Sequence, residues 1–244
     1  MEKTYCVKVA YDGSMFSGWA KQNDNSIRTV QSCIENVLSE ITKEKTNIYG
    51  SGRTDKYVHA IDQCFHFKTK YELDKKILFK QMLIKQPEDI FFKSIKEVNS
   101  SFHSRFSIKK KTYLYKVNTG KFNIFERNYV LQYNKPIDIK KLKKASKNFI
   151  GEKNFLSYST SESINSIRKI ENIRIVKEND YVLFYFTGNG FLRSMIRMIV
   201  GTLLNHNENK TTIDDINYYL DNPKKGSSQA KADGCGLYLY KTVY

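Results

Sequence analysis

The stretch "YGSGRTDKYVHAIDQCFHF" (Tyr49–Phe67) decides the fold, because it joins two expected strands through a glycine-rich turn. Gly50 and Gly52 allow a positive φ, so the chain can leave the first strand sharply. In the second strand, Ile61 to Thr69, two phenylalanines fall on one face, since successive side chains of a strand alternate. The turn also carries a single carboxylate, Asp55, in a chain whose formal net charge is +16.

The segments on both sides of this stretch predict the order strand, helix, strand, strand, helix, strand. The elements of this first half are expected near residues 5–11, 30–41, 46–49, 61–69, 74–85 and 89–98. The second half predicts strands at 111–117, 170–176, 181–187 and 236–244, and helices at 138–149, from 190 and at 214–220. This repeated order is a split β-α-β-β-α-β arrangement. We therefore expect an α+β protein with domains 1–100 and 101–244 and a cleft between them.

The charge predicts a polyanionic partner, because the chain has 41 Lys and Arg residues but only 25 Asp and Glu residues. The alternative is a surface of solvated lysines without such a partner. The four cysteines are far apart in sequence and lack a C-x-x-C pair, and the four histidines lack ligand spacing, so we expect no metal site. The chain enters a strand pattern at once, and its longest apolar stretch is interrupted by an arginine. We expect a cytoplasmic protein without a membrane segment.

An arginine in an apolar helix raises the question of its partner. In "FLRSMIRMIVGTLL" (Phe191–Leu204), Arg197 lies among apolar residues that extend nearly all round the helix. A buried guanidinium keeps its proton and needs an acceptor. Asp55 is a candidate, although a lone aspartate in such a turn is more often a turn or capping residue. Arg197 could instead reach the surface or bind backbone carbonyls.

A basic, aromatic segment follows the first half. No acidic residue occurs between Glu97 and Glu126, and "FHSRFSIKKKTYLYKV" (Phe102–Val117) mixes cations with aromatics. Tyr113 and Tyr115 in this segment suit base stacking next to phosphate contacts, as in proteins that hold unstacked RNA bases. The alternative is an edge strand protected by lysines.

The residue types exclude several classes of reaction on nucleic acids and sugars. The chain has no P-loop for phosphoryl transfer, no zinc ligands for base deamination and no obvious second carboxylate for glycoside hydrolysis. A single carboxylate nucleophile that acts on a flipped base, or on its sugar, remains.

Seven motifs in order then resemble the tRNA pseudouridine synthase A family. They are "YDGSMFSGW" (11–19), "TVQSCIENVL" (29–38), "GSGRTDKYVHAIDQCFHF" (50–67), "FHSRFS" with "KKTYLY" (102–115), "NFLSYS" (154–159), "GNGFLRSMIRMIVGTLL" (188–204) and "GLYLYKTVY" (236–244). The resemblance covers nearly the whole chain.

The resemblance implies two ferredoxin-like halves per chain, a homodimer, and isomerisation of uridine to pseudouridine in the anticodon arm of tRNA, at positions 38 to 40, without cofactor or metal. It assigns Asp55 as the nucleophile, which attacks uracil C6 or ribose C1′. Tyr113 is then expected to stack on the flipped uracil and take the C5 proton, and Arg197 to keep Asp55 ionised. Arg53 is expected to help extrude or replace the target base.

Two alternatives and one departure from the family pattern accompany this interpretation. The chain could be a tRNA-binding protein without catalytic activity on the same fold, or a synthase that acts on other uridines. The family usually has a small residue and glycine after the aspartate, where this chain has Lys56 and Tyr57. If that position requires a positive φ, Tyr57 is strained.

Overall fold

The computed structural model describes residues 2–24, 26–71, 74–161 and 165–244. Cα packing divides the chain into two compact units. The first comprises Met1–Lys109 with Leu239–Tyr244, and the second comprises Lys110–Tyr238. The predicted division into domains 1–100 and 101–244 stays a prediction. Within the described ranges, every helix is too short or too polar to cross a bilayer.

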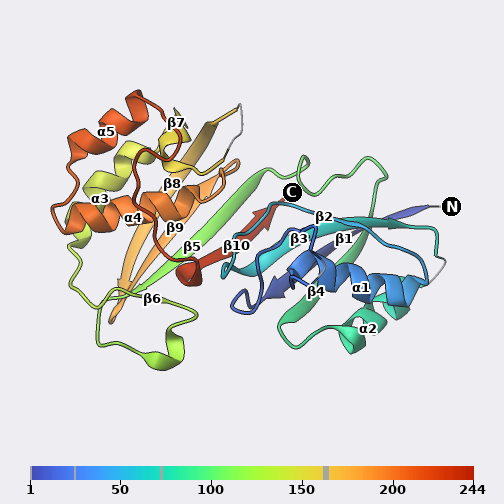
Figure 1. Cartoon of the computed structure of the whole chain (residues 1–244). Helices are drawn as coiled ribbons and strands as arrows, with labels where there is room; N and C mark the ends of the chain where they lie inside the picture. Colours follow the sequence, from blue (N-terminus) through green and yellow to red (C-terminus); the bar gives the residue numbers. More distant parts are fainter. Residues whose placement is uncertain (1, 25, 72–73, 162–164) are drawn as a thin grey trace. The chain divides into compact units, whose positions relative to one another are not determined.

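The first unit has the element order predicted from the sequence (Figure 1). Its elements are β1 (Lys3–Tyr11), α1 (Val30–Thr42), β2 (Ile48–Gly50), β3 (His59–Thr69), α2 (Lys75–Lys85) and β4 (Ile90–Val98). Thr29 caps α1, since its side chain accepts a hydrogen bond from the backbone N–H of Ser32. The α+β class and the β-α-β-β-α-β order of this unit are confirmed.

The sheet of the first unit is built around β1 and β3. β1 pairs antiparallel with β3 on one side and with β4 on the other, and β2 pairs antiparallel with β3. β10 (Leu237–Val243) also lies beside β3, so the end of the chain returns to the first unit. Figure 1 shows α1 and α2 side by side along one face of this sheet, and the two helices contact each other.

The helix-covered face of this sheet forms the core of the unit. Its fully buried residues come from alternate positions of the strands and from the inner stripe of α1; they include Val7, Val9, Ile34, Leu38, Phe65, Phe67 and Phe92. The period of two in β3 thus places both predicted phenylalanines in the core. The alternate residues Cys64 and His66 point to the other face.

The second unit has more elements than the sequence predicted. Its larger elements are β5 (Lys110–Asn118), α3 (Ile139–Ser146), β8 (Ile167–Glu178), β9 (Tyr181–Gly188), α4 (Met195–Asn207) and α5 (Ile213–Asp221). Two short strands were not predicted, β6 (Leu131–Gln132) and β7 (Gly151–Asn154). They are too short to show a period of two, so the pattern gives no signal for them.

The sheet of the second unit runs β5-β9-β8-β7, and α3 packs on β8 and on α4 (Figure 1). The prediction that α4 begins near Gly190 is wrong, because the helix starts at Met195. Ser194 has a φ of +62° in the left-handed region, which interrupts the right-handed helical path directly before the first turn. The apolar character of α4 is confirmed, since most of its side chains are buried.

Candidate active site

The loop that carries Asp55 is attached to the sheet at its start. The backbone N–H of Ser51 donates to the carbonyl of Cys64 (2.7 Å), and the Ser51 hydroxyl donates to the Gln63 side-chain oxygen. The amide of Gln63 donates in turn to the Gly52 carbonyl (2.9 Å). Ser51 and Gln63 are fully buried. These bonds hold the glycine-rich turn in one conformation while it leaves β2.

The segment Tyr11–Trp19 packs against the same loop on another side. Thr54 is the centre of this contact: its hydroxyl bonds the hydroxyl of Tyr11 (2.8 Å), and its carbonyl accepts from the N–H of Trp19 (3.1 Å). Gly18 has a φ of +98°, and a Cβ placed there would lie 2.7 Å from the Thr54 carbonyl oxygen. Only glycine allows the two backbones to approach this closely.

A second glycine makes a similar contact on the other side of Asp55. A Cβ placed on Gly13 would lie 2.1 Å from the carbonyl oxygen of Val58. The N–H of Gly13 donates to Nδ1 of His59 (2.9 Å), which is buried at the start of β3. The aspartate therefore lies between two points where the loop backbone touches the segment Tyr11–Trp19.

The two charged side chains Arg53 and Asp55 of the loop differ in their exposure to solvent. Asp55 is half-buried and Arg53 is exposed. The carbonyl of Asp55 accepts from the N–H of Val58 (3.2 Å), which closes a tight turn. Tyr57, within this turn, has a φ of +66°. The position thus has the positive φ on which strain at Tyr57 depended, and a tyrosine there carries backbone strain that glycine would avoid.

Tyr113 lies in the second unit, on β5. Only 7% of its surface is exposed, and its ring packs edge-to-face on Phe191, with ring centroids 5.3 Å apart. Tyr115, two positions along and on the same face, is fully buried and donates its hydroxyl to the carbonyl of Asp233 (2.7 Å). Tyr115 is therefore a core residue, and its ring is not available for the base stacking that the composition of this segment suits.

Arg197 also lies in the second unit, on the third residue of α4, and is half-buried. Its Nε donates to the carbonyl of Ala232 (2.8 Å), and the N–H of Ala232 donates to the carbonyl of Arg197 (3.0 Å). This agrees with the alternative in which the guanidinium binds a backbone carbonyl. Nε is one of its several donors, so the bond is compatible with a carboxylate partner as well. The pairing of Arg197 with Asp55 stays a prediction.

The structure thus brings together Arg53 and Asp55 in one loop of the first unit. In the second unit, the segment around Ala232 links the other two predicted residues: it bonds Arg197 on α4 and, through Asp233, the Tyr115 hydroxyl on β5, the strand that carries Tyr113.

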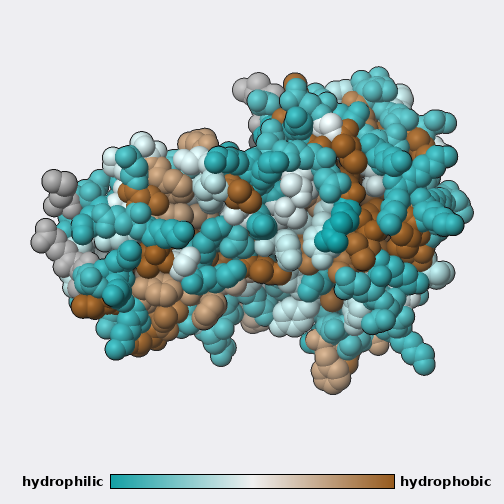
Figure 2. All heavy atoms as spheres, turned by 180° about the vertical axis from the view of Figure 1, so that it is seen from behind, coloured by the Kyte–Doolittle hydropathy of each residue, from teal (hydrophilic) through white to brown (hydrophobic). Residues whose placement is uncertain are grey.

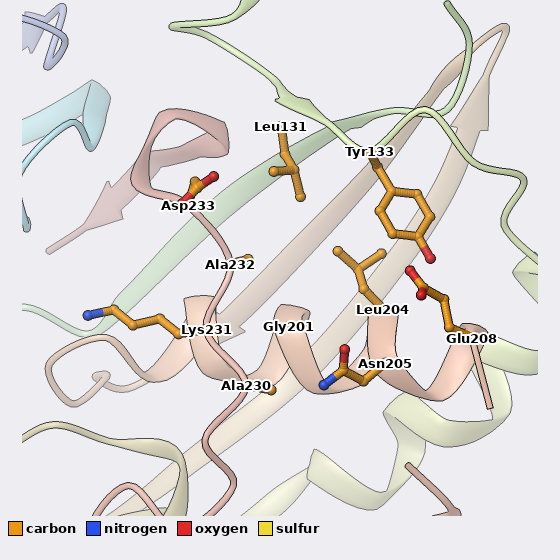
Figure 3. Close-up of a pocket in the computed structure, with 10 residues that line it drawn as sticks. All are labelled: Leu131, Tyr133, Gly201, Leu204, Asn205, Glu208, Ala230, Lys231, Ala232 and Asp233. Atoms are coloured by element: carbon orange, nitrogen blue, oxygen red, sulfur yellow. The ribbon is translucent and has the colours of Figure 1, made fainter. Parts of the chain in front are cut away.

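A small pocket of about 230 Å³ lies beside this segment, between α4 and β6 (Figure 3). Its lining residues are Leu131, Tyr133, Gly201, Leu204, Asn205, Glu208, Ala230, Lys231, Ala232 and Asp233. Figure 3 shows the Tyr133 hydroxyl and the Glu208 carboxylate pointing toward each other. The four predicted site residues are not among those that line this pocket. In the described part of the chain, no group of three or more His, Cys, Asp or Glu side chains could hold a metal ion.

The surface is largely hydrophilic. Hydrophilic side chains cover most of the face shown in Figure 2, and hydrophobic side chains form separate patches among them. Most Lys and Arg side chains of the segment between Glu97 and Glu126 are exposed, including Arg105, Lys109 and Lys110.

Sequence reasoning missed the residues that hold the Asp55 loop, namely Gly13, Gly18, Thr54 and Gln63. The sequence contains one hint of Gly13 and Gly18, because "YDGSMFSGW" has two glycines within nine residues. Their purpose depends on a contact with residues about 40 positions later, which a single sequence does not reveal.

Comparison with known proteins identifies the family. A family model described as tRNA pseudouridine synthase matches residues 8–107 and 145–244. A tRNA pseudouridine synthase A of Malacoplasma penetrans is 50% identical over 241 residues, which cover 99% of this chain and 100% of the relative. The protein of the same name from Mycoplasma genitalium is 44% identical, over 97% of this chain and 96% of the relative. The chain therefore belongs to the tRNA pseudouridine synthase family.

Proposed function

We propose that this protein isomerises uridine to pseudouridine in the anticodon arm of tRNA, at positions 38 to 40, with Asp55 as the nucleophile. The observation that supports this most directly is the fixation of the Asp55 loop between the two glycine contacts. A nucleophile has to meet its target atom in a defined geometry, and a rigid loop supplies that geometry in advance.

The reaction needs no external reactant, because product and substrate have the same atoms. Asp55 attacks ribose C1′ or uracil C6, and the bond between C1′ and N1 breaks. The uracil turns and C5 bonds to C1′ while the bond to Asp55 is released. The proton on C5 leaves, and N1 gains a proton. A carboxylate is suited to both halves of this sequence, since it forms the covalent bond and later leaves.

The other predicted residues assist this sequence in our proposal. Tyr113 stacks on the flipped uracil, and its hydroxyl takes the C5 proton. Arg53, exposed beside Asp55, occupies the gap that the flipped base leaves, and so offsets part of a flipping cost of a few kcal/mol. Arg197 keeps Asp55 ionised; this assignment comes from the family pattern.

Mapping of pseudouridine in unmodified tRNA tests the proposal. Wild type should convert uridines at positions 38 to 40, and Asp55→Asn should lower the single-turnover rate by at least about 10³-fold while tRNA still binds. The matched control is Asp24→Asn, since Asp24 is another loop aspartate of the first unit and is exposed. The proposal fails if Asp55→Asn retains substantial turnover, or if wild type produces no pseudouridine.

The role of the Tyr113 hydroxyl has a separate test. Tyr113→Phe retains the ring and its packing on Phe191, so tRNA affinity should change little. Removal of an essential proton acceptor should slow the reaction by about 10²- to 10⁴-fold. An unchanged single-turnover rate would assign the C5 proton to another base.

We also propose that the protein acts in the cytoplasm as a homodimer. Light scattering of the purified protein should give twice the chain mass of 28.6 kDa. A mass equal to that of one chain would exclude the dimer.

A further inference from the structure

A row of aromatic side chains lies on the first unit, outside the residues assigned to catalysis. Tyr49 and His66 are opposite each other on β2 and β3, and their rings stack with centroids 5.2 Å apart. The ring of His103 lies 4.7 Å from that of His66, and the ring of Phe106 lies 4.4 Å from that of His103. We call these four residues the aromatic platform.

Hydrogen bonds of Ser104 connect the platform to the rest of the unit. His66 is only 3% exposed, and the backbone N–H of Ser104 donates to its Nδ1 (3.2 Å). The Ser104 hydroxyl donates to the carbonyl of Tyr49, and its carbonyl accepts from the hydroxyl of Tyr244 (2.7 Å). Burial lowers the pKa of His66 to about 4, so the ring is neutral at pH 7. His66 and the backbone of Tyr49 are therefore held in place before any ligand binds.

The two ends of the platform are open to solvent. Tyr49 is 53% exposed and Phe106 is 76% exposed, which is high for side chains of this size. Large aromatic rings at the surface usually contribute to a binding site when they are grouped and rigid, because little side-chain entropy is lost on contact. The mechanism proposed above does not use either ring.

The charge around the platform indicates the kind of ligand. The guanidinium of Arg105 lies over the Phe106 ring, 5.8 Å from its centroid, and Lys109 is exposed three residues later. Both belong to the segment between Glu97 and Glu126, which has no acidic residue. Flat rings beside cations fit unstacked bases and their phosphates, the pattern by which proteins hold single-stranded nucleic acid.

We propose that the aromatic platform stacks on one or two unpaired bases of the substrate tRNA, other than the uridine that reacts. This rests on the proposed function, since tRNA is the RNA that the enzyme must hold. Tyr49 directly precedes the glycine-rich turn, so a base bound there would anchor the RNA near the Asp55 loop in the same unit. The platform is a binding site and takes no part in the bond changes.

Leucine substitutions test the stacking contribution. Phe106→Leu and Tyr49→Leu retain apolar side chains and remove the rings. Each should raise the Kd for unmodified tRNA by about 5- to 100-fold, because stacking on one aromatic ring contributes this much per base. The dependence of log Kd on log salt concentration should keep its slope, since no phosphate contact is lost. Turnover at saturating tRNA should stay within about twofold of wild type.

Two further variants separate stacking from other effects. Phe91→Leu is the matched control, because Phe91 is an exposed ring (55%) of the same unit on β4; its Kd should equal that of wild type. Arg105→Gln should reduce the salt slope by about 0.7 to 0.9, as expected for one phosphate contact.

A spectroscopic signature complements the affinities. The chain has one tryptophan, Trp19, which is buried, so a Phe106→Trp variant adds a single exposed fluorophore. Its emission should be quenched when tRNA saturates it, with affinity close to wild type. The inference is overturned if both leucine variants bind tRNA as tightly as wild type, or if the Phe106→Trp emission does not respond to tRNA. If the leucine variants lose affinity but wild type forms no pseudouridine, the platform stands and the proposed function fails.

Discussion

Replacement of Gly13 by alanine should displace the Asp55 loop through a single added carbon. That carbon would lie 2.1 Å from the carbonyl oxygen of Val58 and 2.5 Å from its carbonyl carbon. Non-bonded heavy atoms in proteins prefer separations of about 3.5 to 4.0 Å, so the two backbones must move apart by more than about 1 Å. The obstacle is backbone, which cannot turn away as a flexible side chain would.

Gly13→Ala should lower both the stability of the protein and its reaction rate. Overpacking of this kind costs about 1 to 3 kcal/mol, which corresponds to a fall in Tm of roughly 2 to 12 °C for a chain of this length. The N–H of Val58 donates to the Asp55 carbonyl, so a shift of Val58 moves the aspartate as well. A displacement of about 1 Å at a nucleophile costs about 10²-fold in rate.

Urea unfolding and single-turnover pseudouridine formation measure the two effects. Gly190→Ala is the control for stability, because a Cβ there would find its nearest neighbour only at 3.8 Å and the unfolding free energy should change by less than about 0.5 kcal/mol. If Gly13→Ala unfolds at the wild-type urea concentration and reacts at the wild-type rate, the close contact does not position the loop.

Three further predictions concern stability and thiol chemistry. Tyr57→Gly should raise the unfolding free energy by about 0.5 to 1 kcal/mol in urea titrations, because relief of the positive φ of +66° exceeds the entropy cost of glycine; a fall in stability would show that the position is unstrained. His66, with its pKa lowered to about 4 by burial, stays neutral in the folded chain while the unfolded chain gains a proton below about pH 6.5. Stability should therefore fall between pH 6.5 and 4, by at most about 3 kcal/mol, and His66→Gln should reduce this pH dependence; an identical slope in the variant would contradict the buried neutral ring. The sulfur atoms of Cys6 and Cys64 lie 3.1 Å apart, and this hydrogen bond lowers the pKa of Cys6. Burial raises the pKa of Cys33. Iodoacetamide followed by mass spectrometry should find Cys6 alkylated before Cys33, and the reverse order would exclude a thiolate at Cys6.

Elements with a long and regular pattern could be predicted from the sequence. The alternation in β1 and the spacing of apolar residues after Thr29 correspond to a nine-residue strand and a thirteen-residue helix. The start of α4 was predicted five residues too early, because Phe191 and Leu192 before it are apolar and no sequence rule marks Ser194 as left-handed. Short strands such as β6 contain too few residues for a period to be visible.

Less of the candidate active site than of the fold could be predicted from the sequence. The prediction that Asp55 is the nucleophile rests on its place in a glycine-rich turn and on the family resemblance, and it stays a prediction. The partner of the Arg197 Nε could not be foreseen, because the carbonyl of Ala232 is 35 residues away and a backbone acceptor leaves no mark in the residue type. For the same reason, the sequence did not show that Tyr115 is a core residue: its hydroxyl donates to the carbonyl of Asp233 in the interior.

The return of the chain to its first unit has a consequence during synthesis. Thr242 bonds Asp62 and Lys8, residues that leave the ribosome long before it. At about 5 to 20 residues per second, the nascent first unit waits roughly 7 to 27 s after Lys109 for this strand. Throughout that interval part of one edge of β3 lacks its neighbour, and an open strand edge invites pairing with other chains. We therefore expect the nascent first unit to be more prone to aggregation before β10 is made than after it has paired with β3.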